Sequence, residues 1–290
     1  MGTVVRMTKM HGAGNDYLYV DCRERDLADP PRLARAVARR HHGIGSDGLI
    51  LVRPAPDADC RMEMYNADGS RGEMCGNGIR CVAKYVYDRG LRQNPMHIAT
   101  DDGVKTLALT LTADGAVAGA TVDMGTPVLD GPRIPVASEG RVIDQPLEVG
   151  DATWRITCVS MGNPHCVVFV PDVDTLDLPR IGPRFEQHPF FPKRVNTEFV
   201  AVRAPSELDF RVWERGSGET MACGTGACAA VVAAVLTGRG ARRATVHLRG
   251  GDLDIEWRAD DHVLMTGAAA EVFTADVDLD RLYAATEVTP

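Results

Sequence analysis

The sequence predicts an α+β fold built from two copies of one domain. Cys75 and Cys223 each open a short cysteine-glycine phrase, and they stand 148 residues apart (223 − 75). A helix is expected directly after each cysteine, and the other segments of both halves alternate as strands. Because the same order of elements occurs twice, each half is expected to be a mostly antiparallel sheet with one long helix.

Other polar residues coincide when the chain is shifted by the same 148 positions. A period of this length exceeds the roughly 20–50 residues of solenoid repeats, so it indicates two domains. The alternative is chance, since Gly and Asn are common in turns, but several coincidences at one offset argue against it. The coinciding pairs are Asn15 with Asn163, Gly48 with Asn196, and Asn66 with Glu214.

The first half begins with strands expected at residues 4–10 and 17–21. Asp29 followed by two prolines predicts a helix start, and this helix is expected to continue to about His41. After the Cys75 helix, which should end near Gly90, two alternating runs separated by Ala-Asp-Gly predict a hairpin. The further strands expected here are residues 49–53, 61–66, 106–112 and 117–124.

The second half repeats this order. A strand at 152–160 leads into a loop that contains His165, and a short helix is expected at 179–188. Gly238 is expected to close the Cys223 helix. The other expected strands are 167–170, 199–202, 208–214, 245–248, 253–257 and 263–265. Residues 125–135 are the best linker, and the expected domains are 1–125 with 274–290, and 126–273.

Composition excludes several classes of protein. A chain of 290 residues is long enough for two domains of ordinary size. A net charge of −8 disfavours a nucleic-acid surface. No apolar stretch reaches the roughly 18 residues of a membrane span, and residues 1–20 do not resemble a signal peptide. The cytoplasm is therefore the expected location.

Eight cysteines are too few for a secreted disulfide framework. Their spacings do not give the two-residue gap of a zinc knuckle, so no metal is expected. A metal site that draws on Cys75, Cys223 and His165 remains an alternative. Most of the other thiols are expected to be buried packing residues. These are Cys60, Cys81, Cys158, Cys166 and Cys228.

Cys75 and Cys223 stand where a thiol can become reactive. Unpaired N–H groups and the helix dipole at a helix start stabilise a thiolate, so the thiol pKa is expected to fall. Two such thiols from two halves of one chain suggest a pair of acid/base groups that face one substrate.

Several longer phrases then resemble one family. His-Gly-Ala-Gly-Asn-Asp stands at 11–16, Tyr-Asn-Ala-Asp-Gly-Ser at 65–70 and Cys-Gly-Asn-Gly-Ile-Arg-Cys at 75–81. Gly-Asn-Pro-His follows at 162–165, Asn-Thr-Glu-Phe at 196–199, and a glutamate-to-cysteine phrase at 214–228. In these phrases the chain resembles the diaminopimelate epimerase family over nearly its whole length. Departures are the absence of proline at 265–269, Gly48 where some members have Gln, and Phe273 where Tyr is common.

The resemblance implies a barrel-like sheet around a central helix in each domain, with the active site in the cleft between them. It implies interconversion of LL- and meso-diaminopimelate, for lysine and peptidoglycan synthesis, by Cys75 and Cys223 as catalytic groups with His165 and Glu214 beside them. A homodimer is also implied, with the aromatic at 273 at the contact. The implied substrate-binding residues are Asn15, Asn66, Gly76, Asn77, Asn163, Asn196, Glu214, Arg215, Gly224 and Thr225.

Inverting an amino-acid α-carbon forms a carbanion next to the carboxylate. This carbanion needs stabilisation, which pyridoxal phosphate on a lysine often supplies. This chain has four lysines and none stands in a recognisable cofactor phrase, so no cofactor is expected. Lys84 and Arg211 are expected to be solvated surface charges. Two alternatives stay open: a two-cysteine racemase for proline or hydroxyproline, and a thiol-based redox or metal-binding module.

Overall fold

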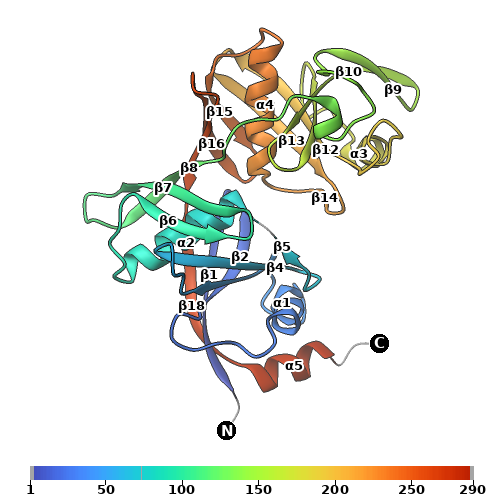
Figure 1. Ribbon diagram of the computed structural model, residues 1–290. Coiled ribbons are helices and arrows are strands. Elements are labelled where there is room, and N and C mark those ends of the chain that lie inside the picture. The colour runs from blue at the N-terminus through green and yellow to red at the C-terminus, as the bar shows by residue number, and fades with distance from the viewer. Residues whose placement is uncertain (1–2, 73, 288–290) are drawn as a thin grey trace. The chain divides into compact units, whose positions relative to one another are not determined.

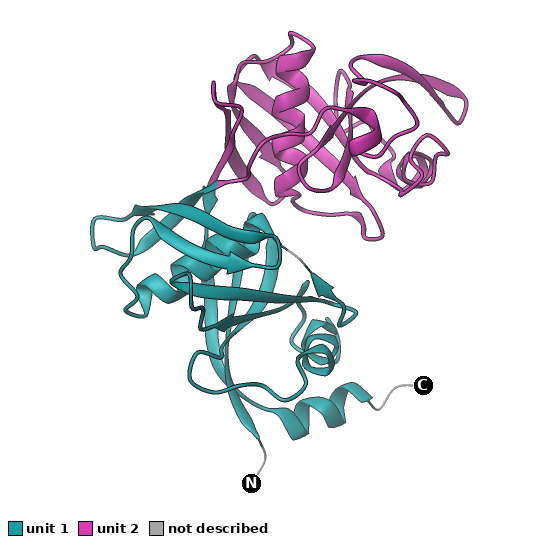
Figure 2. Cartoon of the chain, in the orientation of Figure 1, with its two compact units in different colours: residues 1–122, 267–290 teal, residues 123–266 magenta. Residues whose placement is uncertain are grey.

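The computed structural model describes residues 3–72 and 74–287. The chain divides into two compact units, one of residues 1–122 with 267–290 and one of residues 123–266 (Figure 2). The sequence predicts boundaries a few residues away, at 125/126 and 273/274. Among the described residues, no helix is long and apolar enough to cross a bilayer.

The first unit is a mostly antiparallel sheet with three helices in its described part (Figure 1). The pairs β2–β3 and β4–β6 are parallel, and β1–β2, β1–β18, β3–β4, β6–β7 and β7–β8 are antiparallel. The strands are β1 (Val4–Gly12), β2 (Asn15–Asp21), β3 (Gly48–Arg53), β4 (Cys60–Asn66), β5 (Arg71–Gly72), β6 (Met96–Thr100), β7 (Gly103–Leu111), β8 (Val117–Asp123) and β18 (Ala270–Asp278). The helices are α1 (Pro30–Ala38), α2 (Gly76–Asp88) and α5 (Leu279–Glu287).

The second unit repeats this succession of pairings. Here β11–β12 and β13–β15 are parallel, and β10–β11, β12–β13, β15–β16 and β16–β17 are antiparallel. Its strands are β9 (Gln145–Val149), β10 (Ala152–Ser160), β11 (Pro164–Phe169), β12 (Asn196–Ala204), β13 (Glu207–Glu214), β14 (Gly218–Glu219), β15 (Arg243–Leu248), β16 (Gly251–Trp257) and β17 (Val263–Ala268). Its helices are η1 (Gly131–Arg133), α3 (Leu178–Glu186) and α4 (Gly224–Leu236).

Strand register repeats at the offset found in the sequence. Tyr17 pairs with Gly48 across β2 and β3, and His165 pairs with Asn196 across β11 and β12. Each residue of the second pair lies 148 positions after its counterpart (165 − 17 and 196 − 48). The same offset relates Leu49–Tyr65 to Thr197–Trp213, and Cys60–Ile98 to Leu208–Val246. The α+β prediction and the duplicated order of elements are therefore confirmed.

Each unit packs its sheet around the helix that follows its cysteine. Helix α2 contacts β1, β2, β6, β7 and β18, and α4 contacts β10, β11, β12, β15 and β16. Residues 226–234 of α4 are buried without interruption. A helix that is apolar on all sides must be enclosed, which explains the Ala- and Val-rich sequence of α4.

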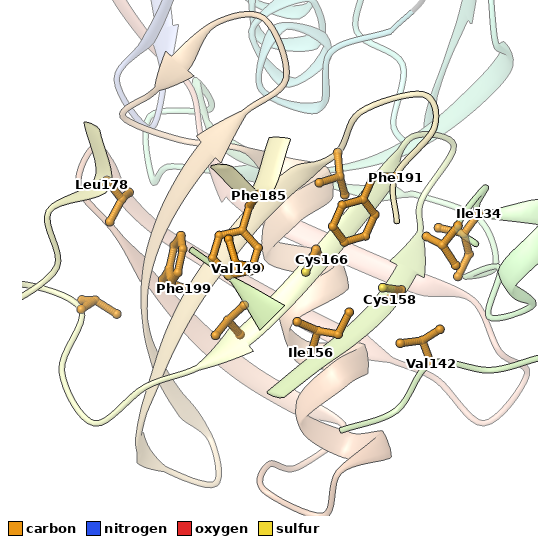
Figure 3. Close-up of a cluster of buried hydrophobic side chains, with 14 of the residues drawn as sticks. Ile134, Val142, Val149, Ile156, Cys158, Cys166, Leu178, Phe185, Phe191 and Phe199 are labelled. Carbon is orange, nitrogen blue, oxygen red and sulfur yellow. The ribbon is translucent and has the colours of Figure 1, made fainter. Parts of the chain in front are cut away.

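The core of the second unit explains two of its cysteines. Cys158 and Cys166 lie among buried side chains that include Phe185 and Phe199 (Figure 3). The rings of Phe185 and Phe199 pack edge to face with centroids 5.5 Å apart. Cys60, Cys81 and Cys228 are also buried, so the packing role expected for these five thiols is confirmed.

Several sequence-based expectations were wrong in detail. Helix α1 ends at Ala38 rather than His41, because Arg39 is extended and its carbonyl accepts from the N–H of Gly43. His165 lies on strand β11 rather than in a loop. Lys84 is largely buried, and its Nζ donates to Asp88 and to the Val117 carbonyl.

The expectation that Arg211 is a solvated surface charge is also wrong, since its side chain is 6% exposed. Its guanidinium donates to the carbonyls of Val173 and Leu176 at 2.6 and 2.9 Å, and it pairs with Glu219. Arg211 therefore fixes the loop before α3 against β13. An alternating strand pattern places a residue on a face, but it does not reveal that a loop covers that face.

Candidate active site

Cys75 occupies the N-cap position of α2. Its backbone is extended (φ −135°, ψ 116°), and the N–H of Gly78 donates to its Sγ at 3.3 Å. A cap side chain of this kind satisfies one of the N–H groups that a helix start leaves without a partner. The thiol lies at the start of a buried helix, as the cysteine-glycine phrase predicts.

Asn15 contacts this thiol. The Cys75 thiol donates to Oδ1 of Asn15 at 3.2 Å, and Nδ2 of Asn15 donates to Asp47 at 2.8 Å. The backbone N–H of Asp16 also donates to Asp47. Burial and the neighbouring Asp16 raise the pKa of the Asp47 carboxyl group. Asp47 therefore fixes the orientation of the Asn15 amide, which turns an acceptor toward sulfur.

Asn77 has a structural role in the first turn of α2. The side chain is 3% exposed, and its Oδ1 accepts from Nη2 of Arg80 at 2.8 Å. Arg80 is fully buried, and its Nη1 donates to the carbonyl of Gly76 at 3.1 Å. Since the side chain of Asn77 is engaged with Arg80, the substrate-binding role predicted for Gly76 and Asn77 would have to use their backbone N–H groups.

Asn66 ends strand β4, where its Nδ2 donates to the hydroxyl of Ser70 at 3.0 Å. It pairs in register with Gly48 on β3. A Cβ added at Gly48 would lie 2.1 Å from the carbonyl oxygen of Tyr65. Position 48 therefore has no room for a side chain, in agreement with the departure noted in the sequence.

Cys223 occupies the same position at the start of α4. Its backbone is extended (φ −124°, ψ 108°), and the N–H of Gly226 donates to Sγ at 3.4 Å. The hydroxyl of Thr225 lies 3.5 Å from the same sulfur. Cys223 is 5% exposed, whereas Cys75 is half-buried. The two predicted catalytic thiols therefore cap two equivalent helices.

His165 lies beside Cys223 and is held at both ring nitrogens. Its Nδ1 is 2.7 Å from Oε1 of Glu198, and its Nε2 is 2.9 Å from Oδ1 of Asn163. The side chains of His165 and Glu198 are both 0% exposed. The structure therefore places the two predicted site residues His165 and Asn163 in contact, and adds Glu198 to them.

The electrostatics of Cys223 differ from the expectation. Burial raises the pKa of the Cys223 thiol well above its ordinary value, and the carboxylates of Glu214 and Glu198 raise it further. The N–H of Gly226 and the hydroxyl of Thr225 oppose these effects but are weaker. The prediction that the helix start lowers this pKa was wrong for Cys223, because desolvation outweighs the helix terminus. The raised pKa favours the thiol form of Cys223.

Glu214 and Arg215 follow one another at the end of β13. Glu214 accepts a hydrogen bond from the hydroxyl of Thr220. The backbone N–H of Arg215 donates to Oδ1 of Asn196 at 2.8 Å, and its exposed guanidinium donates to the Lys193 carbonyl. Asn196 is 4% exposed, and its hydrogen bond holds the backbone of Arg215. The backbone position in turn orients the charged side chain of Arg215.

One group of side chains has the composition of a metal site. Ligand atoms of His165, Glu198 and Cys223 lie within 4.8 Å of one another, and all three residues are buried. The 2.7 Å between Nδ1 and Oε1 is a direct hydrogen bond, which a metal ion would have to replace. The geometry therefore favours a hydrogen-bonded proton site.

Glu198 and Asp47 are the two residues of these sites that the sequence did not single out. Glu198 stands inside the Asn-Thr-Glu-Phe phrase, as the only ionisable side chain in a buried strand segment. An acidic residue in an otherwise apolar run was the available signal. Asp47 had a weaker signal, since it stands in an ordinary Gly-Ser-Asp-Gly loop.

Comparisons with known proteins agree with one another. Residues 7–129 and 157–272 match a family model described as diaminopimelate epimerase. A diaminopimelate epimerase of Acetivibrio thermocellus is 53% identical over 281 residues, which is 96% of this chain and 100% of the relative. A diaminopimelate epimerase of Moorella thermoacetica is 54% identical over 280 residues, which is 95% of this chain and 100% of the relative.

Solved structures with low sequence identity share the fold. A hydroxyproline epimerase from Agrobacterium vitis, solved with trans-4-hydroxy-L-proline bound, superposes with a TM-score of 0.70 at 14% identity. The alignment covers 97% of this chain and 94% of that structure. At this identity the likeness concerns architecture and carries no substrate assignment.

Proposed function

The chain belongs to the diaminopimelate epimerase family and is therefore an isomerase, and we propose that it interconverts LL-2,6-diaminopimelate and meso-diaminopimelate. The observation that carries this proposal is the pair of N-cap thiols. Cys75 and Cys223 each accept a glycine N–H at the start of equivalent helices. The product would serve lysine and peptidoglycan synthesis.

In the proposed reaction, the two thiols act on opposite faces of one α-carbon. One sulfur, as thiolate, takes the proton from the α-carbon and leaves a planar carbanion. The other sulfur, as thiol, delivers its proton to the opposite face, so the configuration is inverted. Two groups on opposite faces complete the inversion without turning the substrate. The roles of Cys75 and Cys223 exchange when the substrate has the other configuration.

The starts of α2 and α4 would stabilise the charge that develops on the reacting carboxylate. Backbone N–H groups at 76–77 and 224–225 stand where a helix binds anions. By analogy with oxyanion donors, each such group contributes about 2–4 kcal/mol to the transition state. These N–H groups would take the place of pyridoxal phosphate in stabilising the carbanion. We therefore propose a reaction that needs neither a cofactor nor a metal ion.

The remaining polar residues would hold the substrate. We assign His165 and Glu214 to the reacting amine and to the protonation of the thiols. Arg215 would bind the distal carboxylate, since a guanidinium can donate to both carboxylate oxygens. Asn15, Asn66, Asn163 and Asn196 would complete the polar surroundings. A substrate charged at both ends fits this set better than proline does. The cytoplasmic location stays a prediction.

The test measures turnover of LL-diaminopimelate and of L-proline by the purified protein without added cofactor. The proposal expects inversion of diaminopimelate only, and loss of inversion in both Cys75→Ala and Cys223→Ala. Cys158→Ala is the matched control, because this thiol lies in the core of the second unit and should leave activity unchanged. Preferential turnover of proline, or full activity in either catalytic variant, would contradict the proposal.

A further inference from the structure

The two thiol sites differ at two equivalent positions. His165 and Glu198 in the second unit correspond to Tyr17 and Ile50 in the first (165 − 17 and 198 − 50 both equal 148). The glycines inside the two helix starts reflect this difference. A Cβ added at Gly78 would lie 2.7 Å from Cδ1 of Ile50, whereas a Cβ added at Gly226 would lie 2.7 Å from Oε1 of Glu198. A carboxyl group thus occupies the place of an aliphatic side chain.

Hydrogen bonds determine how many protons this pair holds. Oδ1 of Asn163 can only accept, so Nε2 of His165 carries a proton. The 2.7 Å contact between Nδ1 and Oε1 of Glu198 then needs one further proton. That proton belongs either to a neutral Glu198 beside a neutral imidazole or to an imidazolium beside a carboxylate. The pair has no net charge in either arrangement.

The position of Glu198 is costly unless it holds such a proton. Both side chains are fully buried, and within the described part of the chain Oε2 of Glu198 has no hydrogen-bond partner. A buried carboxylate with one unsatisfied oxygen is destabilising, whereas a shared proton removes most of this penalty. Burial also raises the pKa of Glu198, although the charge of His165 opposes this.

We propose that Glu198 is a positioning residue for the epimerase reaction, which holds His165 beside Cys223 and shares with it one proton that compensates the Cys223 thiolate. This role rests on the proposed function, and it concerns the Cys223 thiol and not the Cys75 thiol. Its geometric basis is that ligand atoms of the three side chains lie within 4.8 Å of one another.

The proton balance is simple. When Cys223 delivers its proton, the S–H bond breaks and the carbanion electron pair forms the new C–H bond. A thiolate then remains at Cys223. The shared proton moves onto Nδ1, so that an imidazolium faces the thiolate while Glu198 becomes a carboxylate. No proton leaves the His165–Glu198 pair, and the reverse shift follows when Cys223 is reprotonated.

The titratable groups that surround Glu198 are few. His165 and Cys166 lie on β11, Glu214 lies at the end of β13, and Cys223 starts α4. Glu214 also acts electrostatically on Glu198 and on Cys223. A change at Glu198 should therefore alter the titration of Cys223 and leave that of Cys75 unaltered.

The experiment compares Glu198→Gln, Glu198→Asp and the wild-type enzyme in two measurements. The first is the pH dependence of kcat and KM in both directions. The second is the rate of iodoacetamide alkylation at Cys223 and at Cys75, followed by mass spectrometry from pH 6 to 10. Glutamine keeps the size of Glu198 but cannot carry the shared proton. Thr197→Val is the control, since it is a buried neighbour on β12 whose Oγ1 has no hydrogen-bond partner in the described part of the chain.

We expect Glu198→Gln to lower kcat about tenfold or more with KM changed less than about twofold. The alkylation midpoint of Cys223 in Glu198→Gln should rise, because the shared proton that compensates the thiolate is lost. The midpoint of Cys75 should stay, and Glu198→Asp should lie between Glu198→Gln and wild type. Unchanged kcat and midpoint in Glu198→Gln, or equal shifts at both cysteines or in Thr197→Val, would overturn the inference. A wild-type protein without diaminopimelate turnover would instead refute the proposed function, and the alkylation measurement would still test the role of Glu198.

Discussion

Gly226 and Glu198 are packed so closely that a side chain at position 226 would force a neighbouring group to move. A Cβ there would lie 2.7 Å from Oε1 of Glu198 and 3.2 Å from Sγ of Cys223. The backbone of Gly226 is helical, so the requirement for glycine comes from space and not from an unusual φ angle. The glycine of the Cys-Gly-Thr-Gly phrase therefore lets a carboxyl group and a thiol meet at one helix start.

Replacing this glycine should damage the site more than the fold. Gly226→Ala is expected to displace Glu198 or Cys223, lower kcat about tenfold or more, and cost about 1–3 kcal/mol of stability. Gly140→Ala is the control, because a Cβ there would meet nothing within 4 Å. The measurements are kcat and chemical denaturation. Wild-type kcat in Gly226→Ala would show that the close packing has no functional role.

The buried thiols predict a loss of stability at alkaline pH. Burial raises the pKa of Cys60 to about 12 and that of Cys81 to about 11, while an unfolded thiol ionises near pH ~8.5. Above that pH the unfolded chain binds fewer protons than the folded chain, so stability falls as pH rises. Each such thiol lowers the free energy of unfolding by about 1.4 kcal/mol per pH unit.

Cys60→Ala isolates one of these contributions. Denaturation of the variant and of the wild type at pH 7 and at pH 10 gives the change of unfolding free energy for each. The variant should lose less stability between these pH values, by about 1.4 kcal/mol per unit above pH ~8.5. Equal losses in both proteins would mean that Cys60 does not keep its proton in the folded state.

Arg80 is expected to hold the first turn of α2. It is fully buried and donates to Oδ1 of Asn77 and to the carbonyls of Gly76 and Ala268. Arg80→Met leaves these acceptors without that donor and should cost about 3 kcal/mol of stability. The exposed Arg25→Met should change stability by less than about 0.5 kcal/mol. Similar denaturation midpoints for the two variants would contradict this role.

The expected homodimer can be tested at β18. Val272 and Phe273 are exposed by 54% and 40%, respectively, in this strand. We expect the wild type to sediment as a dimer and Phe273→Glu as a monomer, since a charge at an apolar contact is costly. Val104→Glu, at a residue on β7 that is 52% exposed, should remain dimeric. If the Phe273→Glu protein remained a dimer, the dimer contact would not depend on Phe273.

The duplicated architecture was predictable because the sequence repeats the same motifs and order of elements at one fixed offset. The offset between Cys75 and Cys223 is also the offset of paired residues such as Tyr17–Gly48 and His165–Asn196. Local patterns also located most strands and both cysteine helices. The elements that were not predicted lack strict alternation or a clear cap, or are only two or three residues long; they are β5, β6, β9, β14, β18, η1 and α5.

The site was predictable as a set of residues but not as a set of contacts. Motifs named Cys223, His165 and Asn163, yet the hydrogen bond from His165 to Glu198 joins residues 33 positions apart. The pKa of Cys223 depends on burial and on Glu214 and Glu198, which no local pattern encodes. Sequence therefore named the candidate groups, whereas their contacts and protonation needed tertiary structure.

The most direct test of the account is isotope entry during the first turnovers of LL-diaminopimelate in deuterium oxide. If two thiols act on opposite faces, the thiol that protonates the carbanion carries solvent deuterium. The meso product formed first should then hold one deuterium at the inverted α-carbon, while unreacted substrate holds none. Early product that retains the substrate's own α-hydrogen would show that a single group serves both faces, and would contradict the assignment of Cys75 and Cys223.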